Sequence, residues 1–470
     1  MIRTEYYKDL TKMNTFGMKV KARCFMEYDS VADLVDIEFE ELARPVLHIG
    51  GGSNLLFTDD FKGTVLHSRI NFIEILDESL ESHCEERSTS CHCEDSSACH
   101  CEERSTSCHC EGRSTSCHCE ERSDVAISSP VLVSVGAGVV FDDFCEWAAK
   151  EGLWGVENLS YIPGEVGASA VQNIGAYGVE VKDVIRKVYC YDTVEEEFVN
   201  FSVEECGYGY RDSIFKNPEI KGRYIVTHVV FALSRTPQPR LDYGHLKDAV
   251  FAAMNKTAAQ AGSDENNVEQ PVIADQIGNL TPSLIRRVII KIRKEKLPEP
   301  SVKGSAGSFF KNPVVSQEHF ARIEAAAKAE HGPDYNVPHY VVSDPGTVIP
   351  SPLCHCDEQS DVAIIPNPLC HCEERSDVAI IPSPLCHCEE QSDVAISSPM
   401  VKIPAAWMIE QCGWKGKRSG GAAVWEKQPL VIVNYTGEAY PEEIIGLEKR
   451  IIASVKAKFG VDLHPEVEHI

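Results

Sequence analysis

Residues 162–178 read IPGEVGASAVQNIGAYG, a long stretch rich in glycine and other small residues. Small residues dominate it, so its backbone can approach a flat ring closely. Gln172 and Asn173 are amides without an evident structural reason, and they would offer hydrogen-bond donors and acceptors to such a ring. A tightly packed turn is the alternative interpretation. The length of the stretch and its two amides favour contact with a cofactor.

A second glycine-rich stretch, GGGSN at residues 50–54, follows the apolar run VLHI of residues 46–49. Backbone N–H groups in such a turn can form a concave nest for a diphosphate. The turn does not fit the GxGxxG pattern, and no Rossmann spacing occurs elsewhere, so a dinucleotide would have to bind in another fold. Taken alone, GGGSN is explained equally well as a hairpin turn.

Three further positions are candidates for chemistry. Arg211, between an aromatic and an acid in YRDS, could bind a carboxylate or stabilise an enolate, although a surface ion pair is the commoner role. Ser308 stands beside a glycine and two phenylalanines, so its hydroxyl could deliver a proton in a dry pocket. Glu466 matters only if the last residues pack against the core. No GxSxG motif is present, which disfavours a Ser-His-Asp hydrolase.

The acidity and the cysteines of the chain are concentrated in two places. The net charge of −27 over 470 residues argues against nucleic-acid binding, because no basic stripe can neutralise phosphates. Residues 84–124 hold 10 acidic and 4 basic side chains, and residues 353–395 hold 9 and 1. Fifteen of the 20 cysteines lie there too. We expect the others to be small buried apolar residues; they are Cys24, Cys145, Cys190, Cys206 and Cys412.

These two places are repetitive inserts. Residues 352–399 contain three copies of a 16-residue unit beginning PLCHC, and residues 123–130 recur identically at 392–399. The insert at 82–130 is built from CHCEERSTS units. Neither shows a helix or strand period, so we expect surface loops. Cys-His-Cys triplets could bind zinc or copper, but a short tandem repeat has no scaffold to hold the ligands, so no metal site is predicted.

The N-terminal residues contain no apolar run that could act as a signal peptide. No window approaches the roughly 18 apolar residues of a membrane span. We therefore expect a cytoplasmic protein without a membrane partner.

Outside the inserts, strands and helices mix without the regular alternation of a doubly wound sheet, which predicts an α+β fold. Apolar runs predict strands, and apolar residues at helical spacing predict helices. The predicted strands are 131–138, 224–233 and 430–434, and the predicted helices are 141–151, 283–294, 317–330 and 441–458.

Together these motifs resemble the UDP-N-acetylenolpyruvoylglucosamine reductase family. VQNIGAYG followed by YRDS and GSFFKNP is a highly specific combination, and the resemblance covers nearly everything outside the inserts. YGHL at 243–246 looks like the tyrosine loop of the longer subclass of this family. The matching stretches are NTFG at 14–17, GGGSNLL at 50–56, IPGEVGASAVQNIGAYG at 162–178, YRDSIFK at 210–216, GSFFKNPVV at 307–315 and AAWMIEQCGWKG at 405–416.

The resemblance implies a vanillyl-alcohol-oxidase (PCMH)-type FAD-binding fold of two lobes plus a C-terminal α+β substrate-binding domain. It implies that NADPH reduces bound FAD and that UDP-N-acetylenolpyruvoylglucosamine then receives hydride at C3, giving UDP-N-acetylmuramate for peptidoglycan. By motif match, Ser308 would protonate C2, while Arg211 and Glu466 would stabilise the enolate. Glu466 would have to be protonated, which burial can achieve. We expect a monomer whose partners are the UDP-sugar and NADPH.

The resemblance also implies binding residues. Tyr243, Lys296, Asn312 and Gln428 resemble the residues that hold the sugar nucleotide. The positions implied for FAD are Gly50, Gly51, Gly52, Ser53, Asn54, Leu55, Pro163, Gly164, Gly167, Gln172, Asn173, Gly175 and Gly178.

Domain boundaries follow from the motifs and the inserts. We predict FAD-binding lobe 1 at 1–80, the first insert at 82–130, FAD-binding lobe 2 at 131–235, the tyrosine loop and connecting helix at 236–299, the substrate-binding domain at 300–351 and 400–458, the second insert at 352–399, and a C-terminal segment with the catalytic glutamate at 459–470.

Two alternatives stay open. Another FAD-dependent oxidoreductase of the same fold would share the glycine-rich stretches but not YRDS, GSFFKNP and HPEV (residues 464–467) together. A metal-binding protein organised by its Cys-His-Cys repeats is the other. Deletion of residues 84–124 and 353–395 separates the reductase from the metal-binding protein, because the reductase would keep its flavin and activity whereas a metal-binding protein would lose its function.

Overall fold

The computed structural model describes residues 1–76, 129–260, 280–342 and 400–470. They form two compact units, one of Met1–Lys311 with Ala405–Ile470 and the other of Asn312–Pro404. Apart from residues 129 and 130, both repeat inserts lie outside the described residues, so their expected loop character stays a prediction. The predicted domain boundaries also stay a prediction.

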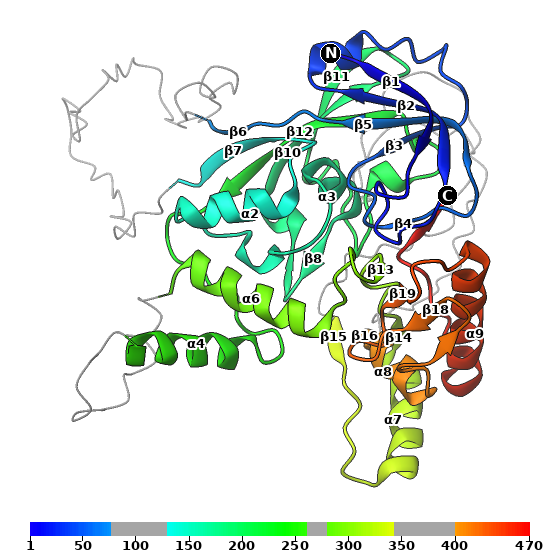
Figure 1. The fold of residues 1–470 in the computed structure, drawn as a ribbon. Helices are drawn as coiled ribbons and strands as arrows, with labels where there is room; N and C mark the ends of the chain where they lie inside the picture. The colour runs from blue at the N-terminus through cyan, green and yellow to red at the C-terminus, as the bar shows by residue number, and fades with distance from the viewer. Residues whose placement is uncertain (77–128, 261–279, 343–399) are drawn as a thin grey trace, which may run out of the picture. The chain divides into compact units, whose positions relative to one another are not determined.

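Four strands form the first sheet of the larger unit, in the order β1-β2-β5-β3 (Figure 1). β1 pairs antiparallel with β2, whereas β2 and β3 both pair parallel with β5. β5 ends in a run of buried residues because it lies between two neighbours. The elements are β1 Arg3–Asp9, β2 Lys21–Tyr28, α1 Val31–Val35, β3 Val46–Ile49 and β5 Phe61–Ser68.

Five antiparallel strands form the second sheet, in the order β11-β10-β12-β7-β6. The central strand β12 reads YIVTHVVFAL and is almost wholly buried. Helix α2 packs on it: the rings of Phe144 and Phe231 lie 4.6 Å apart between centroids. The elements are β6 Ile73–Ile75, β7 Val131–Gly136, α2 Phe141–Lys150, α3 Val166–Gln172, β10 Ile185–Asp192, β11 Glu197–Ser202 and β12 Tyr224–Leu233.

Helix α6 illustrates how local sequence sets an element. The hydroxyl of Thr281 accepts the N–H of Leu284 at the helix start, and Pro282 occupies the first position, where it lacks only an N–H that would be unpaired. Arg286 forms an ion pair with Asp142 of α2. The remaining elements of this region are η2 Glu157–Leu159, β8 Gly175–Ala176, β9 Val179–Glu180, η3 Val181–Asp183, η4 Ile214–Lys216, α4 Leu246–Gln260 and α6 Pro282–Lys296.

A third, antiparallel sheet has the order β13-β19-β18-β17 and packs against α9. The final strand, β20, pairs parallel with β4, which fixes the chain end beside residues 55 and 56 (Figure 1). The elements are β4 Leu55–Leu56, β13 Gly304–Ser305, α8 Ala405–Gln411, β17 Arg418–Ser419, β18 Ala422–Val424, β19 Ile432–Asn434, α9 Pro441–Phe459 and β20 Glu468–His469.

The smaller unit contains the antiparallel sheet β14-β16-β15 and helix α7. Ser316 caps α7, because its hydroxyl accepts the N–H of His319. The elements are β14 Val314–Ser316, α7 Gln317–His331, β15 Tyr340–Val342 and β16 Met400–Lys402.

The predicted α+β class is confirmed, and the predicted strands and helices end within two residues of the observed ones. Helices α3 and α4 were not predicted. α3 lies inside the glycine-rich stretch, where Gly, Ala and Ser hide the apolar period. α4 has only a weak apolar stripe.

Free cysteines behave largely as predicted. Cys24, Cys145, Cys190 and Cys206 are buried. Cys412 is only half-buried, so the expectation was wrong there, because it follows the end of the short helix α8.

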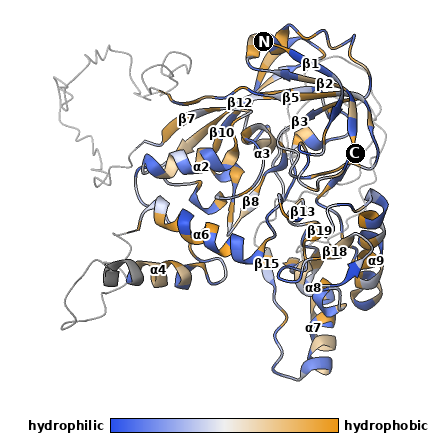
Figure 2. Ribbon diagram, viewed as in Figure 1, coloured by the Kyte–Doolittle hydropathy of each residue, from blue (hydrophilic) through white to orange (hydrophobic). Residues whose placement is uncertain are grey.

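Among the described residues, no helix is both long and apolar enough to cross a bilayer. Figure 2 shows hydrophilic and hydrophobic residues following one another along α6, the pattern of a helix with one face in a core.

Candidate active site

The turn of residues 50–54 requires glycine at its third position. Gly52 has φ +61°, and a Cβ placed on it would lie 1.9 Å from the carbonyl oxygen of Met13. The N–H of Thr15 donates to the carbonyl oxygen of Gly52 over 3.1 Å. The NTFG segment of residues 14–17 is therefore bonded directly to the turn of residues 50–54.

A second glycine lies directly against this turn. A Cβ on Gly51 would be 3.4 Å from Cα of Gly164, and a Cβ on Gly164, at φ +120°, would be 2.9 Å from Oγ of Ser53. The two glycine-rich stretches thus meet backbone to backbone. Within the described ranges, the N–H groups of Gly51, Gly52 and Ser53 donate to no protein acceptor. Clustered backbone donors of this kind bind phosphate, so these residues fit the diphosphate of FAD.

Helix α3 continues the second stretch and packs tightly. A Cβ on Gly167 would lie 2.9 Å from Cβ of Ala137, which directly follows β7, so only a small residue allows this approach. At the far end of α3, Nδ2 of Asn54 donates to Oε1 of Gln172 over 3.0 Å and to the carbonyl oxygen of Glu466 over 2.9 Å. One amide thereby joins the 50–54 turn, α3 and the C-terminal segment.

The side chain of Asn173 forms its hydrogen bonds within the protein and not at an open surface. Its side chain is fully buried, and Nδ2 donates to the carboxylate of Glu180 over 3.0 Å and to the carbonyl oxygen of Gly209 over 2.7 Å. Its Oδ1 accepts the N–H of Lys182 over 3.3 Å. We therefore propose a positioning role for this amide in place of the direct cofactor contact predicted for it.

Arg211 is held in one orientation by three groups. Nε donates to Oε1 of Glu466 over 2.9 Å, Nη1 to the carbonyl oxygen of Asn173 over 3.2 Å, and Nη2 to the carbonyl oxygen of Gly175. The residue itself has φ +57°, a conformation uncommon outside glycine. Its side chain is 16% exposed, so the guanidinium is a preorganised cation at the edge of solvent.

Glu466, four residues from the chain end, packs against the core, which was the condition for it to have a role in the site. Its N–H donates to the carbonyl oxygen of Phe309 over 2.8 Å, and the adjacent Pro465 pairs with Phe310 in an isolated antiparallel bridge. Burial raises the pKa of Glu466 above its ordinary value, although Arg211 and nearby lysines oppose the shift. Protonation of this carboxyl group is thus easier than for a glutamate in water, and the protonated form can donate a hydrogen bond.

Ser308 directly precedes the residue that pairs with Glu466. Phe309 also donates its N–H to the carbonyl oxygen of Leu430 over 2.8 Å, so the backbone next to Ser308 is bonded to two other segments. The neighbouring rings of Phe309 and Phe310 are buried, whereas Ser308 itself is half-buried, and the dry pocket expected for its hydroxyl stays a prediction. The structure therefore brings together the segments carrying all three candidate catalytic residues.

The residues predicted to bind the sugar nucleotide make fewer contacts with the rest of the candidate site than Arg211 and Glu466 do. Tyr243 is 41% exposed, and its ring meets that of Tyr177 edge to face at 6.0 Å, beside the end of the 162–178 stretch. Gln428 is half-buried just before β19, and Lys296 is exposed at the end of α6. Asn312 is the first residue of the smaller unit.

The sequence motifs indicated no role for Lys216, the last residue of YRDSIFK. Its Nζ donates to the carbonyl oxygen of Arg211 over 3.0 Å, which steadies the strained backbone there. Burial, together with the neighbouring charge of Lys311, lowers the pKa of Lys216. A lysine five residues after an arginine is no signal by itself, because only the turn and η4 bring the two together.

Replacement of Gly175 by Ala is expected to displace Arg211. The new Cβ would lie 2.7 Å from Nη1 of Arg211 and 3.0 Å from the carbonyl oxygen of Val179, and only the guanidinium can move readily. We expect turnover to fall about 10- to 100-fold, as for loss of one oriented donor. Gly446→Ala in α9, with nothing within 4 Å, is the matched control. Unchanged steady-state turnover in Gly175→Ala would contradict this geometry.

The fold and this site define an FAD-dependent oxidoreductase. In agreement, the profile described as FAD binding domain matches residues 125–199, and that described as UDP-N-acetylenolpyruvoylglucosamine reductase, C-terminal domain, matches residues 299–470. The Bacteroides fragilis enzyme named UDP-N-acetylenolpyruvoylglucosamine reductase is 38% identical over 462 residues, 98% of each chain. The one of that name from Porphyromonas gingivalis is 33% identical over 474 residues, covering 100% of this chain and 99% of the relative.

The chain therefore belongs to the UDP-N-acetylenolpyruvoylglucosamine reductase family. A crystal structure of the reductase from Thermus caldophilus is also similar, with a TM-score of 0.48 and 17% identity, covering 100% of this chain and 98% of that one.

Proposed function

We propose that this protein catalyses the NADPH-dependent reduction of UDP-N-acetylenolpyruvoylglucosamine to UDP-N-acetylmuramate in the cytoplasm, a step of peptidoglycan precursor synthesis. The observation that carries the proposal is the contact between the half-buried side chains of Arg211 and Glu466, 2.9 Å apart, beside the segment of Ser308 and the apposed glycine turns. Family membership supplies the substrate class.

The apposed turns would hold the cofactor by its diphosphate, through the N–H groups of residues 51–53. FAD, when bound and reduced by NADPH, would supply the hydride. The glycines of α3 and β8 keep the surrounding protein closely packed, because a Cβ on Gly167 would lie 2.9 Å from Cβ of Ala137 and one on Gly175 would lie 2.7 Å from Nη1 of Arg211.

Arg211 and Glu466 would stabilise the negative charge that hydride addition at C3 leaves on C2 and its carboxylate. Arg211 offers a fixed cation, and protonated Glu466 offers a hydrogen bond. Both are preorganised by backbone contacts, so little reorganisation is needed as charge develops. The hydroxyl of Ser308 would then transfer its proton to C2, completing the saturated lactyl ether.

Tyr243, Lys296, Asn312 and Gln428 would bind the sugar nucleotide. A lysine ammonium and a tyrosine hydroxyl are suitable partners for a diphosphate, and amides suit a uracil or sugar.

The purified holoenzyme is expected to be yellow and to bleach when NADPH is added without oxygen. Addition of the enolpyruvyl sugar nucleotide should restore the colour and yield one product per flavin reoxidised. A variant lacking residues 84–124 and 353–395 should behave likewise, which tests the inserts separately. A protein that takes up no flavin would refute the proposal. Bleaching without recovery by the sugar nucleotide would favour a different FAD-dependent oxidoreductase.

A further inference from the structure

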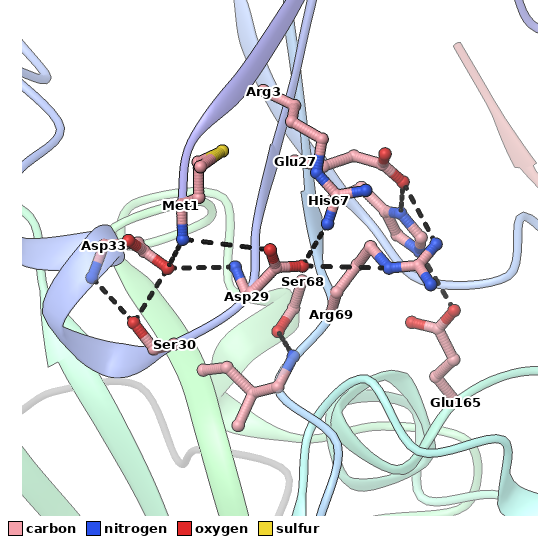
Figure 3. A network of polar contacts seen from close by, with 11 residues as sticks. Met1, Arg3, Glu27, Asp29, Ser30, Asp33, His67, Ser68, Arg69 and Glu165 are labelled. Carbon is pink, nitrogen blue, oxygen red and sulfur yellow. Dashed lines mark hydrogen bonds and ion pairs between the residues drawn. The ribbon is translucent and has the colours of Figure 1, made fainter.

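A buried histidine connects the first sheet to the glycine-rich stretch of residues 162–178. His67, on β5, contacts two carboxylates: Nδ1 lies 2.9 Å from Oε1 of Glu27, and Nε2 lies 3.0 Å from Oε1 of Glu165 (Figure 3). The imidazole is 9% exposed and the two carboxylates are 16% and 11% exposed. Neither contact was predicted from the sequence.

The geometry sets the charge of the ring. A carboxylate accepts hydrogen bonds, so both ring nitrogens must carry a proton to satisfy both contacts, and only the imidazolium has two N–H groups. A neutral ring would direct a lone pair at one of the carboxylates. The arrangement therefore requires a cation between two anions.

No other group described around the ring can supply the positive charge that pairs with Glu165. Arg69 reaches the same oxygen of Glu27 at 3.7 Å but is half exposed. His48, on neighbouring β3, bonds to the hydroxyl of Tyr28 over 2.7 Å, and burial lowers its pKa to about 4, so it is neutral. Arg3 also faces the cluster, because its charge acts on Glu27, and the hydroxyl of Tyr28 lies near the charge of Glu165. Among the described residues, only His67 lies within ion-pair distance of Glu165.

Glu165 links this cluster to the cofactor turns. It stands between Gly164 and helix α3, and a Cβ on Gly50 would lie 3.2 Å from its Oε2. One oxygen of the carboxylate thus faces the 50–54 turn while the other faces His67. The carboxylate can hold this position only with a cationic partner, because a buried charge without one is costly.

We propose that His67 is a positioning residue for the flavin site: its imidazolium holds Glu165 so that the turns of residues 50–54 and 162–167 stay in contact and retain FAD. This proposal rests on the FAD-binding part of the proposed function and does not involve the substrate. Deprotonation of His67 releases Glu165, so flavin retention becomes pH-dependent.

The direction of the pH dependence follows from the contacts. Burial alone would lower the pKa of His67, but the bonds and charges of Glu165 and Glu27 together raise it above its ordinary value. A raised pKa means that the contact is complete at low pH and is lost as the pH rises through the histidine's titration. FAD should therefore dissociate faster at alkaline pH.

The test follows FAD release from diluted holoenzyme by flavin fluorescence, from about pH 6 to about pH 9. Wild type should show release accelerating about 10- to 100-fold across the titration, the effect of one hydrogen bond to a charged group. H67Q should release FAD at the fast rate throughout, with a flat profile. E165Q should also be flat, which keeps the test available if H67Q folds poorly.

His228→Gln is the matched control, because His228 is half-buried on β12 and contacts no carboxylate among the described residues. It should keep the wild-type slope. A wild-type slope in both H67Q and E165Q would overturn the proposal while leaving FAD binding intact. Wild-type protein that binds no FAD would instead refute the proposed function.

Discussion

Replacing Ser308 with Ala is expected to leave reduction of bound FAD by NADPH unchanged and to slow its reoxidation by the sugar nucleotide about 10²- to 10⁴-fold, the range of a lost general acid. Only the second half-reaction needs a proton at C2. The change removes a hydroxyl and leaves the backbone, which is fixed by the bonds of Phe309 to Leu430 and Glu466. The loss should therefore be chemical and not conformational.

Stopped-flow absorbance of the flavin separates the two half-reactions. Ser305→Ala, which removes a buried hydroxyl from β13 three residues before Ser308, is the matched control and should reoxidise at the wild-type rate. Equal slowing of both half-reactions in Ser308→Ala would mean that the serine positions the flavin. No slowing of either would assign the proton to another donor.

Arg211→Lys is expected to retain FAD and to slow reoxidation about 10²- to 10³-fold, the effect of removing an oriented donor from a site of developing charge. Lysine keeps the positive charge, but a single ammonium group cannot reproduce the fork that binds Glu466, Asn173 and Gly175 together. The prediction therefore tests orientation and not charge alone.

Arg223→Lys provides the control for this substitution. Arg223 forms a comparable fork to Asp192, with Nε and Nη2 at 2.9 and 2.7 Å, at the end of β10 and away from the glycine turns. It should change the rates by less than about twofold, as for most surface substitutions. Wild-type reoxidation in Arg211→Lys would show that charge suffices and that the contact with Glu466 is only structural.

Local sequence patterns predicted most of the longer helices and some of the strands, although not α3 or α4, and the residue types that must lie in turns. The apolar spacing in α2, α6 and α9 depends only on neighbours along the chain, so period predicted them correctly. Gly52 was also expected in a turn, because a positive φ favours glycine whatever the rest of the chain does. The motifs around Arg211, Ser308 and Glu466 also indicated these three residues as candidates for chemistry.

Only the tertiary structure decided which of these groups meet and what charge they carry. The contact between Arg211 and Glu466 joins positions 255 residues apart. The pairing of β20 with β4 and the bond from the N–H of Glu466 to Phe309 hold the carboxyl group in place, and burial raises its pKa. The same holds for His67, whose two carboxylate partners come from different parts of the chain. Pairing over such separations depends on strand order and desolvation, which no local pattern contains.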